Sequence, residues 1–385
     1  RDEIYMERYL TKPRHVEVQV LCDQHGNAVY LGTRDCSAQR RHQKLIEEAP
    51  AFDIPEHILR AMGEAAVAVA KGCDYVNAGT VEFLYENEEF YYLEMNTRLQ
   101  VEHPVTEMVT GIDLVEQQLR VAFGEELSIR QEDIEITGHA IEVRINAEDP
   151  AEGQFLPSPG KLTTFKASAG FGTRWDGGYE EGDEISQFYD NLVGKLICWG
   201  KDRETAIART IRALEEFEVA GLSTTIPADL AILKHPDFQE NKHSTKWVED
   251  GLDLTGVKGS PIENSEAGSA SVIRTTDVEV DGKRFSVSMS VPSGKSQIRR
   301  SASATGASAS GGDGQITVPM QGTIVKIQVA VGDTVQSGDI LLVLEAMKME
   351  NNIASDVDGT ISEIGVSEGD SVGAGDVVIV IAPDS

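Results

Sequence analysis

The sequence of 385 residues has little cysteine, few aromatic residues and no long apolar run. Its four cysteines, Cys22, Cys36, Cys73 and Cys198, are scattered without the spacing of a metal site. Such cysteines are typical of free thiols in a reducing compartment, so we expect a cytoplasmic protein. No apolar stretch reaches the roughly 18 residues that a membrane-spanning helix requires, which argues against a transmembrane protein.

Basic residues are also scarce, because 34 Lys and Arg stand against 64 Asp and Glu, a formal net charge of −30. Nucleic acids are bound through basic surfaces that neutralise their phosphates, so this balance argues against a nucleic-acid partner and against binding to anionic membranes. Strongly acidic surfaces are one device of halophiles. A salt-loving source is therefore a hypothesis, which a comparison of the fold in dilute buffer and in molar KCl would test.

A repeat with a period of 37 residues fills the last part of the sequence. Residues 322–327 (GTIVKI) reappear as residues 359–364 (GTISEI), and the Gly-Asp pairs at 332 and 338 reappear at 369 and 375. Alternating residues broken by Gly-Asp pairs predict short strands joined by tight turns. Two such copies predict a small sandwich or flattened barrel that buries its apolar faces. Lys348 lies between the copies on the expected hairpin turn, where a modifying enzyme can reach it.

Residues 316–383, with the string Ala346-Met347-Lys348-Met349, resemble a biotinyl (biotin carboxyl carrier) domain. The related lipoyl domain usually places Asp before its lysine and Ala after it, whereas methionine stands on both sides here. The resemblance therefore implies biotin bound covalently to Lys348, attached by a biotin protein ligase. The alternative is an ordinary surface lysine on a β-barrel.

The first 250 residues predict strands and helices together. An Ala-rich amphipathic helix is predicted over residues 54–71, with Asp53 as its cap and Gly72 at its end. Residues 97–104 are interpreted as a polar loop that Pro104 closes. Further strands are predicted at 15–20, 28–32, 138–146, 161–166 and 193–199, and further helices at 112–123 and 203–217.

Residues 35–48 are dense in polar side chains. One interpretation is a solvated charged loop, which charge runs usually form. The other is a loop that grips phosphates, since Arg and Lys are the natural donors to phosphate oxygens.

Residues 80–85 and 90–96 predict a hairpin that turns at Asn87-Glu88. Centring the hairpin on Glu88 puts Glu82 opposite Glu94, and Asn96 shares their face because side chains alternate along strands. Like charges directly opposite in a sheet are destabilising, and hard cations such as Mg²⁺ prefer such oxygens. The pattern therefore predicts a metal site, with a solvated polar face as the alternative.

Four strings in residues 1–250 resemble biotin carboxylase, an ATP-grasp ligase: residues 40–44 (RRHQK), 94–98 (EMNTR), 100–107 (QVEHPVTE) and 144–150 (RINAEDP). The expected fold is the α+β C-terminal portion of an ATP-grasp domain with a biotin carboxylase C-terminal domain, followed by an all-β flattened-barrel biotinyl domain. The expected domains are 1–125 (ATP-grasp), 126–250 (biotin carboxylase C-terminal), 256–298 (a small β module that could dock a partner), 299–315 (a flexible Ser/Ala/Gly tether) and 316–383 (biotinyl).

The resemblance also implies a role for individual residues. Glu102 is the general base that takes the proton from bicarbonate, Arg98 binds bicarbonate, and Arg144 stabilises charge on the ureido oxygen of biotin. The remaining implied ligands are Glu7, Leu10, His15, Gln39, His42 and Lys44 for ATP, Gln100 and Val101 for bicarbonate, and Glu82, Glu94 and Asn96 for Mg²⁺ (or Mn²⁺).

These expectations lead to three possible functions. The first is ATP-dependent carboxylation of biotin through carboxyphosphate, with Lys348 carrying biotin to a separate carboxyltransferase subunit that acts on an acyl-CoA such as acetyl- or propionyl-CoA. The others are a non-catalytic biotin carrier with a remnant ATP-grasp part, and the biotin carboxylase subunit of a two-subunit pyruvate carboxylase. The first implies a hetero-oligomer.

Biotin carboxylases usually carry an N-terminal domain and a glycine-rich lid before the segment that matches residues 1–10. We therefore expect these 385 residues to be the C-terminal part of a longer protein or a truncated gene product. On this expectation the ligase part alone is weakly stable and nearly inactive, while the biotinyl domain folds and accepts biotin by itself.

Overall fold

The structure is a computed structural model that describes residues 6, 8–186, 189–257, 271–280, 283–292, 310–311, 315–318, 321–346, 349–355, 357–373 and 375–383. The chain divides into two compact units. The first consists of residues 1–186 and 191–262, and the second of residues 187–190 and 263–385. Among the described residues, no helix is long and apolar enough to cross a membrane.

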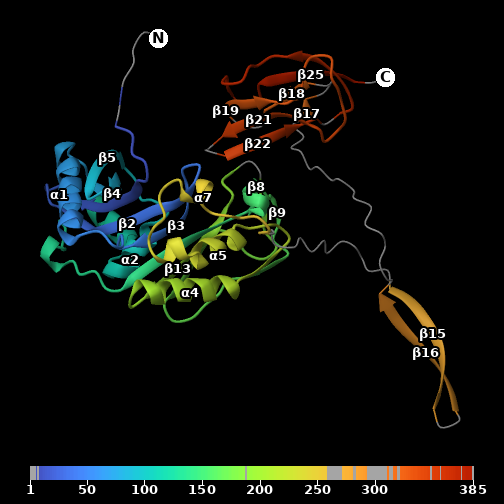
Figure 1. Ribbon diagram of the computed structural model, residues 1–385, viewed down its shortest axis with the longest axis horizontal. Helices are drawn as coiled ribbons and strands as arrows, with labels where there is room; N and C mark the ends of the chain where they lie inside the picture. The colour runs from blue at the N-terminus through green and yellow to red at the C-terminus, as the bar shows by residue number, and fades with distance from the viewer. Residues whose placement is uncertain are drawn as a thin grey trace. The chain divides into compact units, whose positions relative to one another are not determined.

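An eight-stranded antiparallel sheet runs through the first unit (Figure 1). Its order is β11-β13-β6-β3-β2-β1-β4-β5. The strands are β1 (Arg14–Cys22), β2 (Ala28–Arg40), β3 (Gln43–Ala49), β4 (Asn77–Glu86), β5 (Glu89–Asn96), β6 (His139–Asn146), β11 (Thr173–Gly177) and β13 (Leu192–Gly200). The strands expected at 15–20, 28–32, 138–146 and 193–199 are therefore confirmed.

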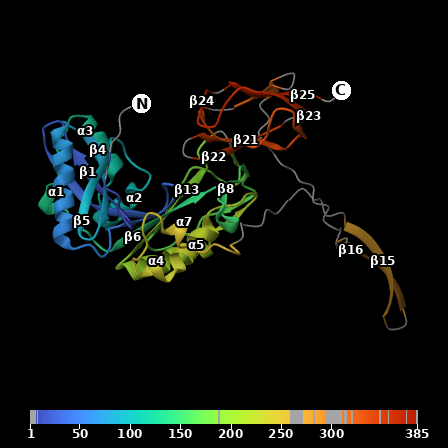
Figure 2. The same cartoon turned by 45° about the horizontal axis from the view of Figure 1, so that its top comes forward.

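The two faces of this sheet differ in chemistry because alternate residues point to opposite sides. On one face, Val16, Val18 and Val20 of β1 pack with α1 (Glu56–Gly72) in an apolar core. Farther along the sheet, α4 (Arg203–Glu215) and α5 (Ile226–Lys234) pack with β6 and β13 in a second apolar core. Figure 2 shows α1 lying along one part of the sheet and α4 beside α5 along the other.

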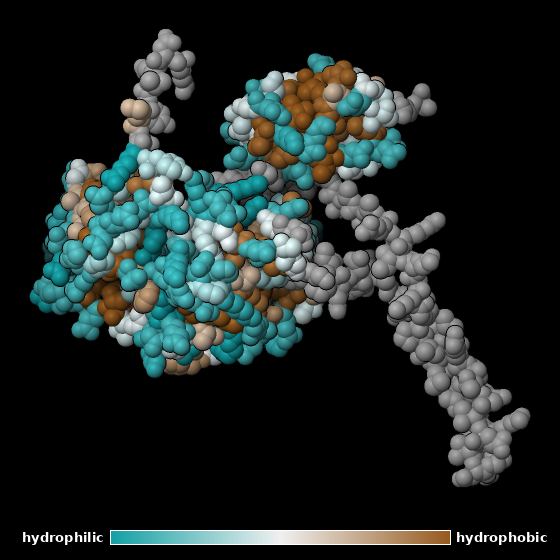
Figure 3. All heavy atoms as spheres, viewed as in Figure 1, coloured by the Kyte–Doolittle hydropathy of each residue, from teal (hydrophilic) through white to brown (hydrophobic). Residues whose placement is uncertain are grey.

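The opposite face carries buried polar side chains, beginning with His15, Glu17 and Gln19 of β1. It is covered in part by α2 (His103–Thr110), which contacts β2, β3, β6 and β13. The solvated loop expected at residues 35–48 is wrong. These residues form β2 and β3, and half of their polar side chains are buried, because charged partners such as Arg14 on β1 and Arg203 on α4 meet them. Figure 3 shows that the exposed surface of this unit on the side in view is mostly hydrophilic.

Helix ends differ from the sequence predictions in three places. Helix α1 begins at Glu56 after Pro55, and Asp53 does not cap it; Asp53 has a φ of 55°. The loop expected at 97–104 ends earlier, because Pro104 lies in the first turn of α2, where its missing N–H costs no hydrogen bond. Helix α3 (Leu114–Ala122) begins two residues later than expected, with the Asp113 side chain accepting a hydrogen bond from the Glu116 N–H.

Short elements complete the first unit. The strand expected at 161–166 is split into β9 (Gly160–Lys161) and β10 (Thr164–Lys166), and α4 ends two residues before the expected Phe217. The remaining elements are η1 (Gln131–Asp133), β7 (Glu148–Asp149), η2 (Ala151–Gly153), β8 (Leu156–Pro157), β12 (Glu184–Ile185), β14 (Glu218–Ala220), α6 (Pro236–Gln239) and α7 (Trp247–Asp250).

The second unit contains the repeat as two small sheets, ordered β17-β18-β25-β23-β20 and β22-β21-β19-β24. Three strands recur 37 residues later: β19 (Gly322–Ile327) as β23 (Gly359–Ile364), β20 (Thr334–Val335) as β24 (Ser371–Val372), and β21 (Ile340–Ala346) as β25 (Val377–Pro383). The turns repeat too: Gly332 and Gly369 have φ values of 100° and 93°, which glycine adopts without strain. The all-β prediction is therefore confirmed.

Strand β22 (Met349–Ala354) pairs with β21 as a hairpin, with Ala346 opposite Met349. The predicted attachment residue Lys348 is outside the described residues. The tether expected at 299–315 is mostly outside them too, but Ser310–Gly311 form β17, which pairs with β18 (Gln315–Thr317). The hairpin expected within 256–298 is present as β15 (Ser271–Val280) and β16 (Lys283–Pro292).

Candidate active site

Lys44 lies at the centre of a buried charged network on the polar face of the sheet. Its Nζ donates hydrogen bonds to Glu17 and, at 2.5 Å, to Glu102 Oε1, and lies 3.5 Å from Glu82 Oε1. Burial lowers the pKa of Lys44, but the carboxylates around it prevail and hold the pKa well above its usual range. The lysine is therefore a permanent positive charge among three carboxylates.

Arg34 is completely buried and binds several members of this network. Its guanidinium donates to Glu17 Oε2 at 3.0 Å, Gln100 Oε1 at 2.9 Å and Gln19 Oε1 at 2.7 Å. Further bonds reach Thr80 on β4 and Thr106 on α2. Burial raises the pKa of Glu17, yet the charges of Lys44 and Arg34 outweigh it and lower that pKa to about 2. Glu17 is thus ionised, and it holds both cations in place.

Glu102 is the last residue before α2, and both of its carboxylate oxygens bind a cation. Lys44 occupies Oε1, and Arg144 Nη2 donates to Oε2 at 2.9 Å. Burial and the nearby Glu17 charge raise the pKa of Glu102, but Lys44 and Arg144 prevail and lower it. The carboxylate is thereby kept ionised and able to accept a proton, next to two cations that can bind an anion.

The β4–β5 hairpin has the expected register, with Glu82 opposite Glu94 and Asn96 opposite Thr80. Asn96 Nδ2 donates to Glu82 Oε1 at 2.9 Å and to Glu94 Oε1 at 3.1 Å, so the three side chains meet at one edge of the network. Burial raises the pKa of Glu82, but the hydrogen bond from His15, at 2.8 Å, and the charge of Lys44 lower it to about 2. The ionised Glu82 carboxylate, the exposed Glu94 carboxylate and the Asn96 amide form an oxygen-rich set that fits Mg²⁺.

The structure thus brings together His15, Lys44, Glu82, Glu94, Asn96, Gln100, Glu102 and Arg144. Val101 lies between Gln100 and Glu102 in the sequence, and its carbonyl oxygen accepts a hydrogen bond from Lys195 Nζ. Gln39 lies beside Lys44 in the β2–β3 register.

Other predicted residues lie apart from this network. Arg98 is exposed and donates to the Leu99 carbonyl oxygen at 3.4 Å. His42 is exposed in the turn between β2 and β3, with a φ of 63°. Leu10 is buried at the edge of the first unit, and Glu7 lies outside the described residues.

Sequence reasoning missed Glu17, Arg34 and Lys195. Glu17 had a usable signal, because it alternates with His15 and therefore shares its face. Arg34 had a weaker signal, because it lies opposite Glu17 in the hairpin of the consecutive strands β1 and β2. Lys195 had none, since it reaches the Val101 carbonyl oxygen from β13, which is distant in the sequence.

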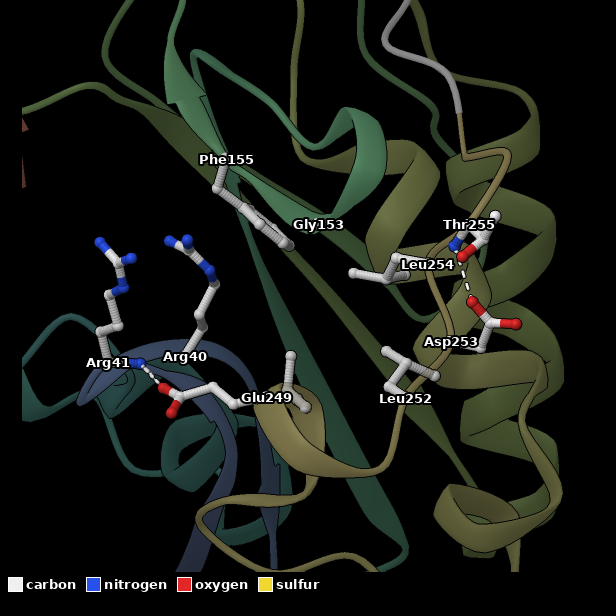
Figure 4. Close-up of a pocket in the computed structure, with 10 residues that line it drawn as sticks. Arg40, Arg41, Gly153, Phe155, Glu249, Leu252, Asp253, Leu254 and Thr255 are labelled. Carbon is white, nitrogen blue, oxygen red and sulfur yellow. Dashed lines mark hydrogen bonds between the residues drawn. The ribbon is translucent and has the colours of Figure 1, made fainter.

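A separate pocket of about 450 Å³ lies beyond the β2–β3 turn (Figure 4). Arg40 and Arg41 line one side of it, with the Arg40 guanidinium 4.8 Å from the Phe155 ring centroid. The Arg41 N–H donates to Glu249, and Leu252 to Thr255 line the far side. None of the network carboxylates lines this pocket, so the predicted site and the pocket are distinct.

Three family models match the chain. Residues 1–130 match "Carbamoyl-phosphate synthase L chain, ATP binding domain", residues 142–250 match "Biotin carboxylase C-terminal domain", and residues 314–381 match "Biotin-requiring enzyme". The chain thus combines ATP-grasp and C-terminal domains of the biotin carboxylase type with a biotinyl-type domain.

Among its relatives is the biotin-dependent acyl-coenzyme A carboxylase alpha3 subunit of Mycobacterium leprae, 45% identical over 92% of this chain and 62% of the relative. A pyruvate carboxylase subunit of Methanothermobacter thermautotrophicus is 52% identical over 64% of this chain and 50% of its own. The crystal structure of a biotin carboxylase–β,γ-ATP complex from Campylobacter jejuni is 46% identical, with a TM-score of 0.61 over 63% of this chain and 54% of that one. The chain thus spans half to three fifths of these relatives.

Proposed function

We propose that this protein carboxylates biotin with bicarbonate at the expense of ATP, and that Lys348 carries the biotin to a separate carboxyltransferase. The observation that carries the proposal is Glu102, a buried carboxylate held between Lys44 and Arg144. A base next to two fixed cations suits a reaction that binds an anion and removes its proton.

ATP supplies the phosphoryl group that activates bicarbonate, which is a poor electrophile. Such transfer depends mostly on positioning and on neutralising charge. Lys44 supplies one positive charge for the phosphate or bicarbonate oxygens. Gln100, whose Nε2 donates to Glu82 Oε1 at 2.8 Å, fixes the position of that carboxylate. Glu102 takes the proton from bicarbonate, and Arg144 offers N–H donors to an oxygen that gains negative charge.

Glu82, Glu94 and Asn96 would hold Mg²⁺ (or Mn²⁺), whose charge would offset that of the ATP phosphates. Asn96 points its amide nitrogen at both carboxylates, and rotation of the amide would present its oxygen to the ion instead. His15, Gln39, His42 and Leu10, with Glu7, would contact the nucleotide. Arg98 would swing from the surface to bind bicarbonate, aided by Gln100 and the Val101 backbone.

An acyl-CoA carboxylase is the assembly we favour. The alignment with the Mycobacterium leprae alpha3 subunit continues through 92% of this chain, whereas the alignment with the pyruvate carboxylase subunit of Methanothermobacter thermautotrophicus covers 64%. The implied partners are a carboxyltransferase subunit that acts on an acyl-CoA, and a biotin protein ligase that modifies Lys348. This assembly would be a cytoplasmic hetero-oligomer.

The test measures ADP formation as a function of biotin and bicarbonate, with and without a supplied N-terminal segment. ADP formation that requires both substrates and is lost in Glu102→Gln supports the proposal. A protein that accepts biotin at Lys348 but cleaves no ATP would instead be a carrier without ligase activity. Co-purification of the carboxyltransferase, followed by assays with acetyl-CoA, propionyl-CoA and pyruvate, then identifies the acceptor.

A further inference from the structure

Two buried glutamates face each other beneath the site. In the antiparallel pair β3–β6, Glu47 lies directly opposite Glu142, and such pairs point to the same face of a sheet. Both residues are completely buried. Glu142 is on the same face as Arg144, two residues farther along β6, so the pair adjoins the residue that binds Glu102.

The hydrogen bonding of this pair is incomplete. Glu47 Oε1 accepts from Arg144 Nε at 2.6 Å. Glu47 Oε2 and both carboxylate oxygens of Glu142 are buried, and within the described part of the chain they have no hydrogen-bond partner. Buried polar atoms without partners are rare and costly in native proteins, and an ionised carboxylate without a donor is the costliest kind.

A neighbouring glutamate, Glu48, shows which partners a buried, ionised carboxylate has in this sheet. Glu48 points to the opposite face and accepts from Arg203 Nε at 2.6 Å and from His139 Nε2 at 2.7 Å. Its pKa is raised by burial but lowered far more by Arg203 and His139. Within the described residues, Glu142 has no such contact. Burial and the adjacent Glu47 charge keep the pKa of Glu142 well above its usual range.

The charged groups around Glu142 come from several elements: Glu47 on β3, Arg144 on β6, Lys195 on β13, and Glu102 directly before α2. The two cations are engaged elsewhere. Arg144 bonds to Glu47 and Glu102, and Lys195 donates to the Val101 carbonyl oxygen. A second negative charge at Glu142 would compete with Glu102 for Arg144.

We propose that Glu142 and Glu47 share one proton, so that the pair carries a single negative charge, and that Glu142 is a positioning residue for Arg144. With the proton on Glu142, its O–H donates to Glu47 Oε2, and Glu47 Oε1 remains free to hold Arg144 Nε. Arg144 Nη2 then stays directed at Glu102. The role in catalysis rests on the proposed function; the shared proton does not.

The shared proton is tested by infrared spectroscopy of the whole chain at pH 8, where exposed carboxyl groups are ionised and absorb away from the protonated carboxyl band. Asp229 is completely buried, and burial holds its pKa well above the usual range despite the nearby Thr225 side chain, so it provides a matched control. We expect Glu142→Gln to remove one protonated component and Asp229→Asn to remove a different one. A spectrum that Glu142→Gln leaves unchanged overturns the shared proton, whatever the enzyme activity.

The positioning role has two further tests. Glu142→Leu removes the donor to Glu47 and should raise the KM for biotin about tenfold, while Glu142→Gln, which can still donate, restores it and extends activity to higher pH. Equal KM values and equal pH profiles for the wild type and both variants overturn the role. A double-mutant cycle of Glu142→Leu with Arg144→Met, followed by thermal unfolding, measures the coupling without any activity assay; zero coupling also overturns it.

Discussion

Arg34 is the residue whose loss the structure predicts to be most damaging to the first unit. It is completely buried, and its six hydrogen bonds reach Glu17, Gln19, Thr80, Gln100 and Thr106. Arg34→Met keeps most of the volume but leaves Glu17 buried with one cation fewer. Breaking a buried pair in this way costs about 3–5 kcal/mol. For a unit of this size the midpoint of thermal unfolding should fall by roughly 6–20 °C.

The assay is unfolding of the whole chain in urea and by heat, with Arg60→Met as the control. Arg60 lies 3.3 Å from Glu56, but the two side chains are 61% and 90% exposed, so this change should cost at most about 1 kcal/mol. Arg34→Met combined with Glu17→Gln should recover part of the loss, because the uncompensated charge is gone. A cost below about 1 kcal/mol for Arg34→Met would refute the view that this network depends on paired buried charges.

Three further predictions follow from the site and the repeat. Lys348 should be the sole biotinylation site, so intact-mass analysis after co-expression with a biotin ligase should show one added biotin, and Lys348→Arg should show none. In a complete ligase that carries these residues, Glu102→Gln should lower biotin carboxylation by roughly 10²–10⁴ with nucleotide binding nearly intact; unchanged turnover at neutral pH would remove Glu102 from its role. The pKa of about 2 for Glu17 and Glu82 lies below the ordinary 4.5, so their contribution to stability should be complete above about pH 4.5 and lost as pH falls towards 2. A free energy of unfolding that stayed constant between pH 5 and 3 would contradict this.

The β4–β5 hairpin shows what the sequence could predict. A hairpin centred on Glu88 and a period of two predicted that Glu82, Glu94 and Asn96 share one face. The structure reaches this pairing through a shift of register between Glu82 and Phe83, because its two-residue turn pairs Glu86 with Glu89. The 37-residue repeat was equally readable, because its turns need glycine at fixed positions and its strands alternate. Both features depend only on residues close together in the sequence.

The centre of the site could not be predicted in the same way. Lys44 reaches Glu17 and Glu102 because β3, β2 and β1 are neighbours in the sheet and α2 lies against β2 and β3. The local periodicity of apolar and polar residues does not predict this order of strands. The polar residues of 35–48 were ambiguous for the same reason: a charge run is solvated when it has no partners, and buried when distant strands supply them.

The network also constrains how Glu102 can work as a base. Lys44 and Arg144 keep it ionised but lower its pKa, which makes it a weak acceptor of protons in the substrate-free state. An anion that binds between the same two cations takes up part of their charge, and the pKa of Glu102 then rises towards its usual range. On the proposed function, bicarbonate would therefore strengthen the base that deprotonates it. The arrangement limits proton uptake by Glu102 until the anion is bound, because only then is the positive charge around the carboxylate shared.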